Sequence, residues 1–243
     1  SVAVNSGAKI SASSSGTGDA GSITITAPGN VGQMVVTTPA LSLNDATITT
    51  STSSSGNAGS ITANVGTLTL TNAAEISSSS IGAATGAAGS VTIQGLASPA
   101  NSVTLTDSSL LTSAANTGHG GSITVDTTNL ALNHATISAS VKDFKAADSS
   151  DSAAVGTGNI ALTAPTINMT GGTITAATTG TRNAGTVSLN AASVSVANGT
   201  LTTSTSGTGA AGAITITTTG NPVSLASGSS ITSSPTGAGN AGQ

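Results

Sequence analysis

The stretch GNAGSITANVGTLTLTNAAEISSSS, residues 56–80, decides the fold of this chain. Apolar side chains alternate with polar ones at Ile61 and Ala63 and again at Leu68 and Leu70, and a single isoleucine, Ile76, follows. An alternation with a period of two is typical of a β-strand with one buried face, whereas a helix repeats about every 3.6 residues. The stretch therefore predicts three short strands that turn one face to a core.

The same three apolar positions recur along the chain, and we call them the first, second and third positions. An anchor glycine precedes each first position, at Gly21, Gly59, Gly89, Gly121, Gly158, Gly185, Gly212 and Gly242. The first positions begin at Ile23, Ile61, Val91, Ile123, Ile160, Val187 and Ile214. The third positions are Ile10, Ile48, Ile76, Leu111, Ile137, Ile174, Leu201 and Ile231. Most Val, Ile and Leu residues occupy these positions, which a disordered chain has no reason to arrange.

A repeat that cannot bury its own apolar face is stabilised by stacking on its neighbours. We therefore predict an all-β fold, a right-handed single-stranded parallel β-helix (β-solenoid) with three strands per coil. The spacing predicts about 7–8 coils of about 27–38 residues in one domain over residues 1–243. The third side should be thin, because small residues such as Ala12, Ser78 and Ala176 follow the third positions.

Two further columns predict turns. A residue type that tolerates left-handed backbone, or bonds its own backbone, follows each second position. These residues are Ser6, Asp45, Asn72, Asp107, His134, Gly171, Asn198 and Ser227. Asparagine recurs two residues before the anchor glycine at Asn57, Asn183 and Asn240, and we expect these amides to stack into a ladder.

The composition excludes several classes of protein. Charged residues make up 5% of the chain, the net charge is −4 and there is no cysteine. Without a basic cluster we expect no binding to nucleic acid, which needs Lys and Arg opposite its phosphates. No apolar run reaches the roughly 20 residues of a membrane-spanning helix, so we expect no membrane insertion. Cysteine absence also excludes disulfides and thiolate metal sites.

Side chains with catalytic or metal-binding chemistry are scattered. His119 and His134 both fall in turn columns, and Asp45 and Asp107 share a column but lie two coils apart. Asp126 has no acidic neighbour in its outward column, whereas glycoside hydrolysis needs paired carboxylates. We therefore expect no enzyme activity, no cofactor and no metal. A carbohydrate-binding or carbohydrate-processing β-helix remains one alternative.

An ice-binding solenoid is a second alternative. Outward Thr-x-Thr pairs occur at Thr24/Thr26, Thr47/Thr49 and Thr215/Thr217. A flat and ungapped grid would be needed. In the first-position strands the grid is interrupted by Asn64, Gln94, Asp126 and Ala161.

Three phrases carry a family resemblance: NSGAKISASSSGTGDAGSITITA (5–27), NAAEISSSSIGAATGAAGSVTI (72–93) and NGTLTTSTSGTGAAGAITI (198–216). The order and spacing of their residues resemble the repeats of filamentous-haemagglutinin-like exoproteins of the two-partner secretion type, especially those of cyanobacteria. The resemblance covers nearly the whole chain. It implies a β-helical rod that is secreted to the cell surface and acts in adhesion, aggregation or filament and sheath formation. The family's secretion domain with its NPNG signature is absent, as is an RGD motif.

Two units are longer than the others, near residues 28–40 and 141–156, and insertions in solenoids form loops on one face. The first adds Met34, Val35 and Val36, which we expect to form an extra strand packed on the side and to be further candidate partner contacts. The second contains the only aromatic residue, so the candidate partner contacts there are Lys142, Asp143, Phe144 and Lys145.

The chain opens and closes inside a repeat, so we expect a solenoid without caps at both ends, a segment of a longer protein or a stacking subunit. The partners expected from these features are further copies of the chain, bound end to end or laterally, and cell-surface or extracellular polysaccharide.

Overall fold

The computed structural model describes residues 1–14, 25–26, 34–82, 84–97, 99–115, 118–142, 158–179 and 181–242. Within these residues every regular element is a β-strand, and every strand pair is parallel. The strands form one 14-stranded sheet, one 8-stranded sheet and one 2-stranded sheet. The predicted all-β parallel solenoid is thus confirmed.

The 14-stranded sheet combines the first and second positions. Its first-position strands are β8 (Val91–Gln94), β12 (Ile123–Asp126), β16 (Ile160–Thr163), β19 (Val187–Ala191) and β22 (Ile214–Thr218). Its second-position strands are β1 (Val2–Asn5), β9 (Ser102–Thr106), β13 (Asn129–Asn133), β17 (Thr166–Thr170), β20 (Ser193–Ala197) and β23 (Val223–Leu225). In β4 (Met34–Asn44) and β6 (Ile61–Thr71) both positions lie on one continuous strand, which joins the two rows.

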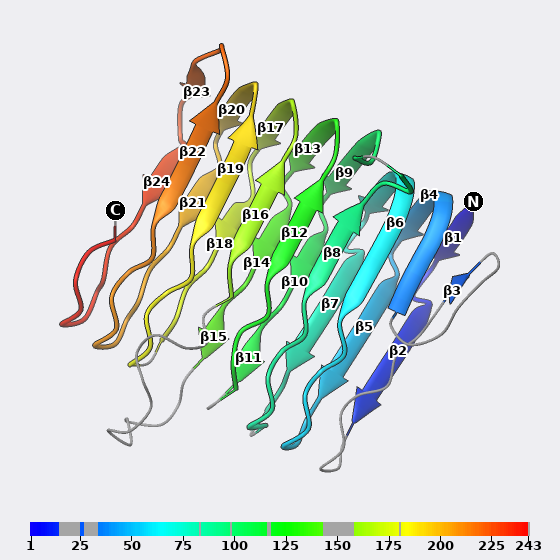
Figure 1. Ribbon diagram of the computed structural model, residues 1–243, viewed down its shortest axis with the longest axis horizontal. Helices are drawn as coiled ribbons and strands as arrows, with labels where there is room; N and C mark the ends of the chain where they lie inside the picture. Colours follow the sequence, from blue (N-terminus) through cyan, green and yellow to red (C-terminus); the bar gives the residue numbers. More distant parts are fainter. Residues whose placement is uncertain are drawn as a thin grey trace.

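The 8-stranded sheet holds the third positions, one strand for each coil. Its members are β2 (Lys9–Ser14), β5 (Thr47–Thr52), β7 (Glu75–Ser80), β10 (Ser109–Leu111), β14 (Thr136–Ser138), β18 (Thr173–Thr175), β21 (Thr200–Thr202) and β24 (Ser230–Thr232). The short strands are β3 (Ile25–Thr26), β11 (Ala114–Ala115) and β15 (Val141–Lys142). In Figure 1 the front strands point upward, the chain crosses to the back at their tips, and coils advance from right to left, which is a right-handed winding.

Each strand pairs with its equivalent one coil away, in register. In the third-position sheet the shortest step is 27 residues, from Leu110 to Ile137 and from Ile174 to Leu201, and the longest is 38 residues, from Ile10 to Ile48. The interior is a continuous column of Leu, Ile and Val side chains, including fully buried Leu70, Ile93 and Leu105. The predicted coil lengths are therefore correct.

One third position was assigned wrongly. The structure places Leu110, not Leu111, in register with Ile76 and Ile137. Leu110 is fully buried, and Leu111 points to the opposite, outer side of the sheet. The connection from Leu105 to the third position spans five residues here, and both leucines fit the range of five or six that the sequence allows.

The predicted turns are confirmed by their backbone angles. Seven of the eight residues have a positive φ: Ser6 (58°), Asp45 (50°), Asn72 (54°), Asp107 (48°), His134 (50°), Gly171 (69°) and Asn198 (54°). In the last coil the left-handed residue is Gly228 (76°) instead of the expected Ser227. The connection is one residue longer in three coils, and there a backbone N–H closes the turn: Ala8 to Asn5 O (3.3 Å), Ala74 to Thr71 O (3.2 Å) and Ser229 to Ala226 O (3.1 Å).

The third side of the core is thin, as predicted, and partly polar. Hydroxyl groups there donate to the carbonyl oxygens of the anchor glycines, with Ser78 bonding Gly59 (2.7 Å) and Thr112 bonding Gly121 (2.7 Å). Thr203 bonds Gly212 in the same way (2.7 Å). A buried carbonyl without a partner is costly, so these inward hydroxyls have a structural role.

The anchor glycines form a column in which no side chain fits. A Cβ added to Gly121, Gly185 or Gly212 would overlap the carbonyl oxygen of the anchor glycine one coil earlier. Gly89, Gly158 and Gly242 make the same close approach. The anchor is therefore glycine because the backbones of successive coils touch at this corner.

The expected asparagine ladder is wrong. The side-chain oxygen of Asn57 accepts a hydrogen bond from the backbone N–H of Ala87 (2.8 Å), and Asn183 does the same with Ala210 (2.8 Å). Alanine stands in the coil next to each of these asparagines, so a side chain bonds to backbone and not to another amide. The contact still ties one coil to the next.

The first expected insertion also needs correction. Met34–Val36 is not an extra strand on the side, because Met34 pairs with Ile61 and Val36 with Ala63 in the regular ladder. It supplies the first position of its coil, the place assigned above to Ile23 and Ile25. Strand β3 instead pairs with Val36–Thr37 on the other edge of β4. Both segments contain β-branched residues, Val35 and Val36 in one and Ile25 and Thr26 in the other, so their pattern alone does not distinguish them.

The glycine column leads to a first prediction. Gly185→Ala should lower the free energy of unfolding by about 3 kcal/mol, because the methyl group displaces the neighbouring coil. The midpoint of thermal unfolding, followed by circular dichroism, should drop by roughly 6–12 °C. Gly82→Asn is the matched control, since Gly82 has a left-handed φ of 67° and open space around it. Equal midpoints for the two variants would contradict the close approach.

A second prediction concerns the inward hydroxyls. Thr112→Val keeps the shape of the side chain but leaves the Gly121 carbonyl without its donor, which should cost about 1–3 kcal/mol. Thr112→Ser keeps the hydroxyl and should cost clearly less. Chemical denaturation of both variants measures the difference, and a valine variant as stable as the serine variant would show that the hydrogen bond contributes nothing.

Candidate functional site

The outer side of the 8-stranded sheet carries a regular array of hydroxyl groups, which we call the hydroxyl face. Strand alternation turns every second residue outward. In β14, β18, β21 and β24 these residues are Thr136 and Ser138, Thr173 and Thr175, Thr200 and Thr202, and Ser230 and Thr232. Their strands pair in register, so the rows are about 4.8 Å apart and the columns are continuous. Four successive rows therefore form an uninterrupted uncharged grid.

The sequence did not predict this grid. In the outward column of the first-position strands, Asn64, Gln94 and Asp126 interrupt the threonines. The available signal was the motif TIS, TIT, TLT and SIT at successive third positions, in which the apolar residue points in and both flanking hydroxyls point out.

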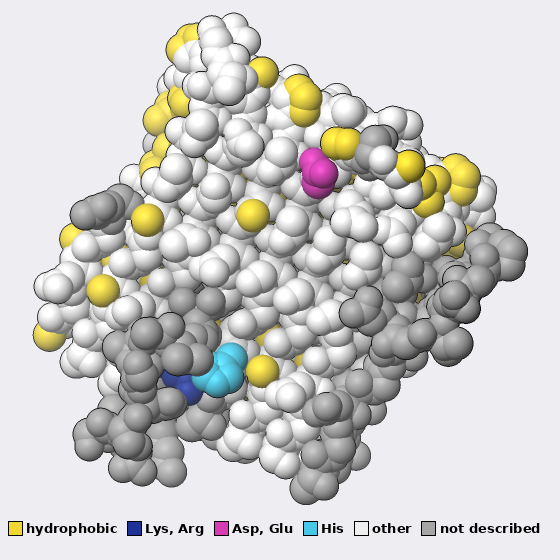
Figure 2. All heavy atoms as spheres, in the orientation of Figure 1, with side chains coloured by type: hydrophobic (Ala, Val, Ile, Leu, Met, Phe, Trp, Pro, Cys, Tyr) yellow, Lys and Arg dark blue, Asp and Glu magenta, His cyan; other side chains and the backbone are white. Residues whose placement is uncertain are grey.

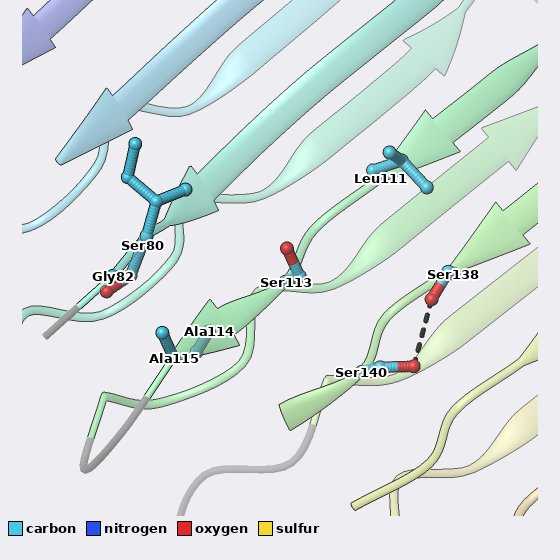
Figure 3. A pocket seen from close by; sticks show the side chains of 9 residues that line it. Ser80, Gly82, Leu111, Ser113, Ala114, Ala115, Ser138 and Ser140 are labelled. Carbon is cyan, nitrogen blue, oxygen red and sulfur yellow. Dashed lines mark hydrogen bonds between the residues drawn. The ribbon is translucent and has the colours of Figure 1, made fainter. Parts of the chain in front are cut away.

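The N-terminal half of the hydroxyl face is different, because two large apolar side chains interrupt it. Leu111 takes the outward column in β10, and Ile81 follows the end of β7 with 48% of its surface exposed. Around them lies a depression of about 550 Å³ (Figure 3). Its lining residues are Ser80, Ile81, Gly82, Leu111, Ser113, Ala114, Ala115, Ser138 and Ser140.

A second depression of about 320 Å³ shares Ile81, Leu111 and Ser113 with the first and extends toward the N-terminal coils. It is lined further by Lys9, Thr47, Thr49, Ser51, Glu75, Ser77 and Ser79. We call the two depressions together the outer groove. The groove crosses strands β2 to β14 along the axis of the solenoid, with Leu111 and Ile81 at its middle.

The hydroxyls of the groove are partly bonded to one another. Ser138 and Ser140 share a hydrogen bond of 2.9 Å (Figure 3), and Ser113 donates to Ser79 at 3.1 Å. Ser80 differs from them, because it is 2% exposed and its hydroxyl is the one buried side-chain polar atom without a hydrogen-bond partner among the residues that the structure describes.

The outer side of the first-position strands is also nearly free of charge (Figure 2). Amides bridge its coils, with Gln94 donating to Asn64 at 2.7 Å and Asn64 donating to Thr37 at 3.5 Å. Asp126 lies in the same column, between Gln94 of the preceding coil and Thr163 of the next coil. The isolated carboxylate predicted from the sequence therefore has no acidic residue beside it in its column.

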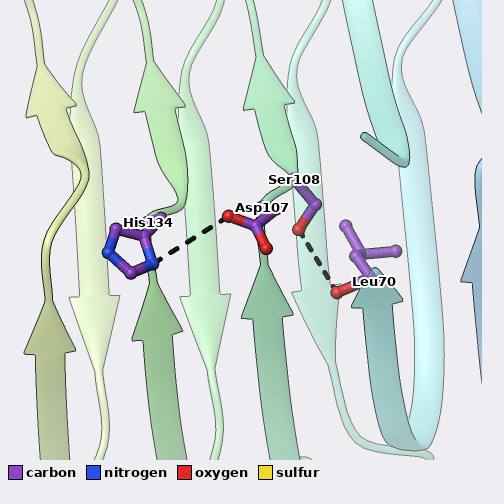
Figure 4. A network of polar contacts seen from close by, with 4 residues as sticks. All are labelled: Leu70, Asp107, Ser108 and His134. Carbon is purple, nitrogen blue, oxygen red and sulfur yellow. Dashed lines mark hydrogen bonds and ion pairs between the residues drawn. The ribbon is translucent and has the colours of Figure 1, made fainter. Parts of the chain in front are cut away.

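His134 lies in a left-handed turn, whereas His119 lies in irregular backbone between strands. His134 Nδ1 approaches Asp107 Oδ1 at 3.9 Å between adjacent coils, and both side chains are well exposed (Figure 4). Beside them Ser108 donates to the Leu70 carbonyl at 3.3 Å. An exposed contact at this distance contributes at most about 1 kcal/mol. No group of three or more His, Asp or Glu side chains that could hold a metal ion occurs in the described part of the chain.

The only arginine of the sequence is buried. Arg182 is 6% exposed and donates through Nη1 to the Gly118 carbonyl at 2.8 Å, from a coil 64 residues later. It therefore spans the coil between them and acts as a structural link. Across the ranges given above, no helix is long and apolar enough to cross a membrane.

Of the predicted partner contacts, the structure describes Met34–Val36 and Lys142. Val36 is fully buried in the core, so it offers nothing to a partner, and Met34 precedes it in β4 with Val35 between them. Lys142 ends β15, whose Val141 is buried against Ala114. Asp143, Phe144 and Lys145 lie outside the described residues.

Comparison with known proteins gives no match to a protein-family model, to a curated protein or to a solved structure. The sites above are therefore interpreted from their own chemistry.

Proposed function

We propose that this chain is a non-catalytic structural segment of a secreted, extracellular surface fibre or adhesin. The observation that carries the proposal is the in-register stacking of eight third-position strands, whose outer side is rich in hydroxyls from β14 to β24, together with a first-position face that is nearly uncharged (Figure 2). Flat neutral sheets stack and pack laterally without electrostatic repulsion between copies. The repeat cadence shared with filamentous-haemagglutinin-like exoproteins supports the same role.

Within this proposal the partners are other copies of the chain, which bind laterally or end to end, and extracellular polysaccharide. Regular stacking supports rod formation, since each coil contacts only its neighbours and the number of coils sets the length of the rod. Neutral faces also favour contacts that depend little on salt, because few charges are available for screening. Adhesion, aggregation and sheath formation are all compatible with such a rod.

Immunogold labelling of intact cells that produce the chain tests this function. Antibodies against residues 158–242 should label unpermeabilised cells, mark thin filaments in negative stain, and lose their target after external protease treatment. Labelling that requires permeabilisation would contradict the surface location, and label spread over amorphous material would contradict the fibre.

Ice binding is a second candidate, favoured by the four uninterrupted rows of the hydroxyl face from β14 to β24. Such a grid presents hydroxyl groups at regular intervals, with a methyl group beside six of the eight. The first-position strands lack this regularity, so any ice-binding activity belongs to the hydroxyl face.

Thermal hysteresis of the purified chain tests this second candidate. The parent chain should show thermal hysteresis. Thr175→Tyr should abolish most of this hysteresis, because a large ring in the centre of the grid prevents close contact with ice. Ser188→Tyr, on the outer side of β19, is the control and should retain it. Absence of hysteresis in the parent chain eliminates ice binding.

A further inference from the structure

One corner of the solenoid carries an exposed leucine. At this corner, which we call the connecting corner, the chain passes from a first-position strand to the second-position strand of the same coil. Residues 127–128 make this passage between β12 and β13, whereas residues 95–101 make it between β8 and β9. Leu96 lies in the longer connection and has 51% of its surface exposed. Because this side chain adds nothing to the core, it is an apolar group available to a partner.

A depression lies at the same connecting corner, in the coils of β16 and β19, and we call it the corner depression. Its volume is about 220 Å³, its apolar lining is Ala164, Pro165, Ala191 and Ala192, and none of its lining residues is charged. The carbonyl oxygen of Pro165 accepts hydrogen bonds from the backbone N–H groups of Ala192 and Ser193, both at 3.0 Å. These bonds fix the backbone around the depression, which is therefore preformed.

The leucine and the corner depression do not meet within one copy. In the 14-stranded sheet β12 separates β8 from β16, and β19 follows β16. Coils are about 4.8 Å apart, so the connection that carries Leu96 lies roughly 10–14 Å from the depression along the solenoid axis. Figure 2 shows hydrophobic side chains along this edge of the first-position face. An occupant of the depression therefore has to come from outside the copy, and a leucine side chain suits its apolar lining.

A second copy of the chain satisfies both features at once. When that copy is turned end for end about a two-fold axis along β12, its solenoid axis is reversed and its connecting corner stays on the same side. Leu96 of each copy then lies opposite the corner depression of the other, because β12 is about midway between β8 and the depression. Both contacts are the same, so the association closes as a pair and does not grow into a filament.

The first-position face between the two contacts adds area with little charge. Its strands from β6 to β22 cover about 29 Å along the axis and about 17 Å along the strands. Two copies would bury roughly 1,000 Å² there, which is the lower limit for a specific interface, so we expect a reversible pair. Asp126 is the only charged residue in these strands and lies beside the axis, where it faces its own copy.

We propose that two copies of this chain associate laterally as an antiparallel pair, with Leu96 of each copy in the corner depression of the other. This inference rests on the proposed surface-fibre function, because it names the face through which neighbouring rods join. The two can fail separately. The oligomeric state of the purified chain tests the pair, whereas labelling of intact cells tests the location and the fibre.

Sedimentation equilibrium of the purified chain up to about 1 mM tests the pair. The parent should form a reversible dimer, and Leu96→Ser should raise its dissociation constant by about tenfold or more, because the apolar contact is lost twice. Ala192→Leu, which fills the corner depression from within, should have the same effect. Ile81→Ser is the matched control, since Ile81 is 48% exposed and follows the third-position strand β7, and it should leave the dissociation constant unchanged.

Unfolding midpoints of the variants show that a weaker dimer does not result from lost folding. Leu96→Ser should unfold like the parent, and it decides alone if Ala192→Leu lowers the midpoint. A parent that stays monomeric over this concentration range overturns the proposal. An association that Leu96→Ser leaves unchanged, or that Ile81→Ser weakens equally, overturns it as well, because the contact then lies on another surface.

Cysteine cross-linking tests the antiparallel orientation, since the chain has no cysteine of its own. Ala97→Cys keeps Leu96 in place, and under a mild oxidant it should form a mixed disulfide with Ala192→Cys on the other copy. Ala97→Cys alone should give little cross-linked dimer. Predominant cross-linking of Ala97→Cys with itself would show parallel copies and overturn the antiparallel pair.

Asp126→Asn tests the position of the two-fold axis. It removes the repulsion between two carboxylates that face each other beside the axis, so it should strengthen the dimer severalfold at low salt. A dissociation constant equal to that of the parent places the axis elsewhere and contradicts the proposed pairing of Leu96 with the corner depression.

Discussion

The stacking of one coil directly on the next is the constraint on which the rest of this structure depends. At the anchor corner the glycine backbones touch, and a single methyl group would overlap the carbonyl of the coil before. That contact sets the register, and the register places equal positions above one another about every 4.8 Å along the axis. Each outward column must therefore hold residues that tolerate a copy of themselves nearby, which explains why charged residues make up 5% of the chain.

The features that recur in each coil could be predicted from the sequence, because each coil repeats the same residue pattern. The strand alternation, the coil lengths and seven of eight left-handed turn residues were predicted correctly. Errors occurred where two neighbouring candidates satisfied the same rule. Leu110 and Leu111 both fit the spacing from Leu105, and only the pairing with Ile76 shows which one points inward. Met34–Val36 and Ile25 compete in the same way for the first position of one coil.

The candidate site escaped the sequence analysis for the same reason. Assigning Leu111 to the core left no apolar residue on the hydroxyl face, so the outer groove had no centre. Its hydroxyls gave no signal of their own, because serine and threonine are common on every face of this chain. The unpaired hydroxyl of Ser80 is a three-dimensional fact, since neighbouring Ser77, Ser78 and Ser79 all find partners.

Specificity in a periodic protein resides where the period is broken. A perfect array offers the same contacts at each coil, so a ligand bound to it could slide by one coil at no cost. Leu111 removes that equivalence, because it places an apolar side chain in an outward column that holds Ser77 in the coil before and Ser138 in the coil after. The regular coils would then supply rigidity, and the interruption would determine where along the rod a partner binds.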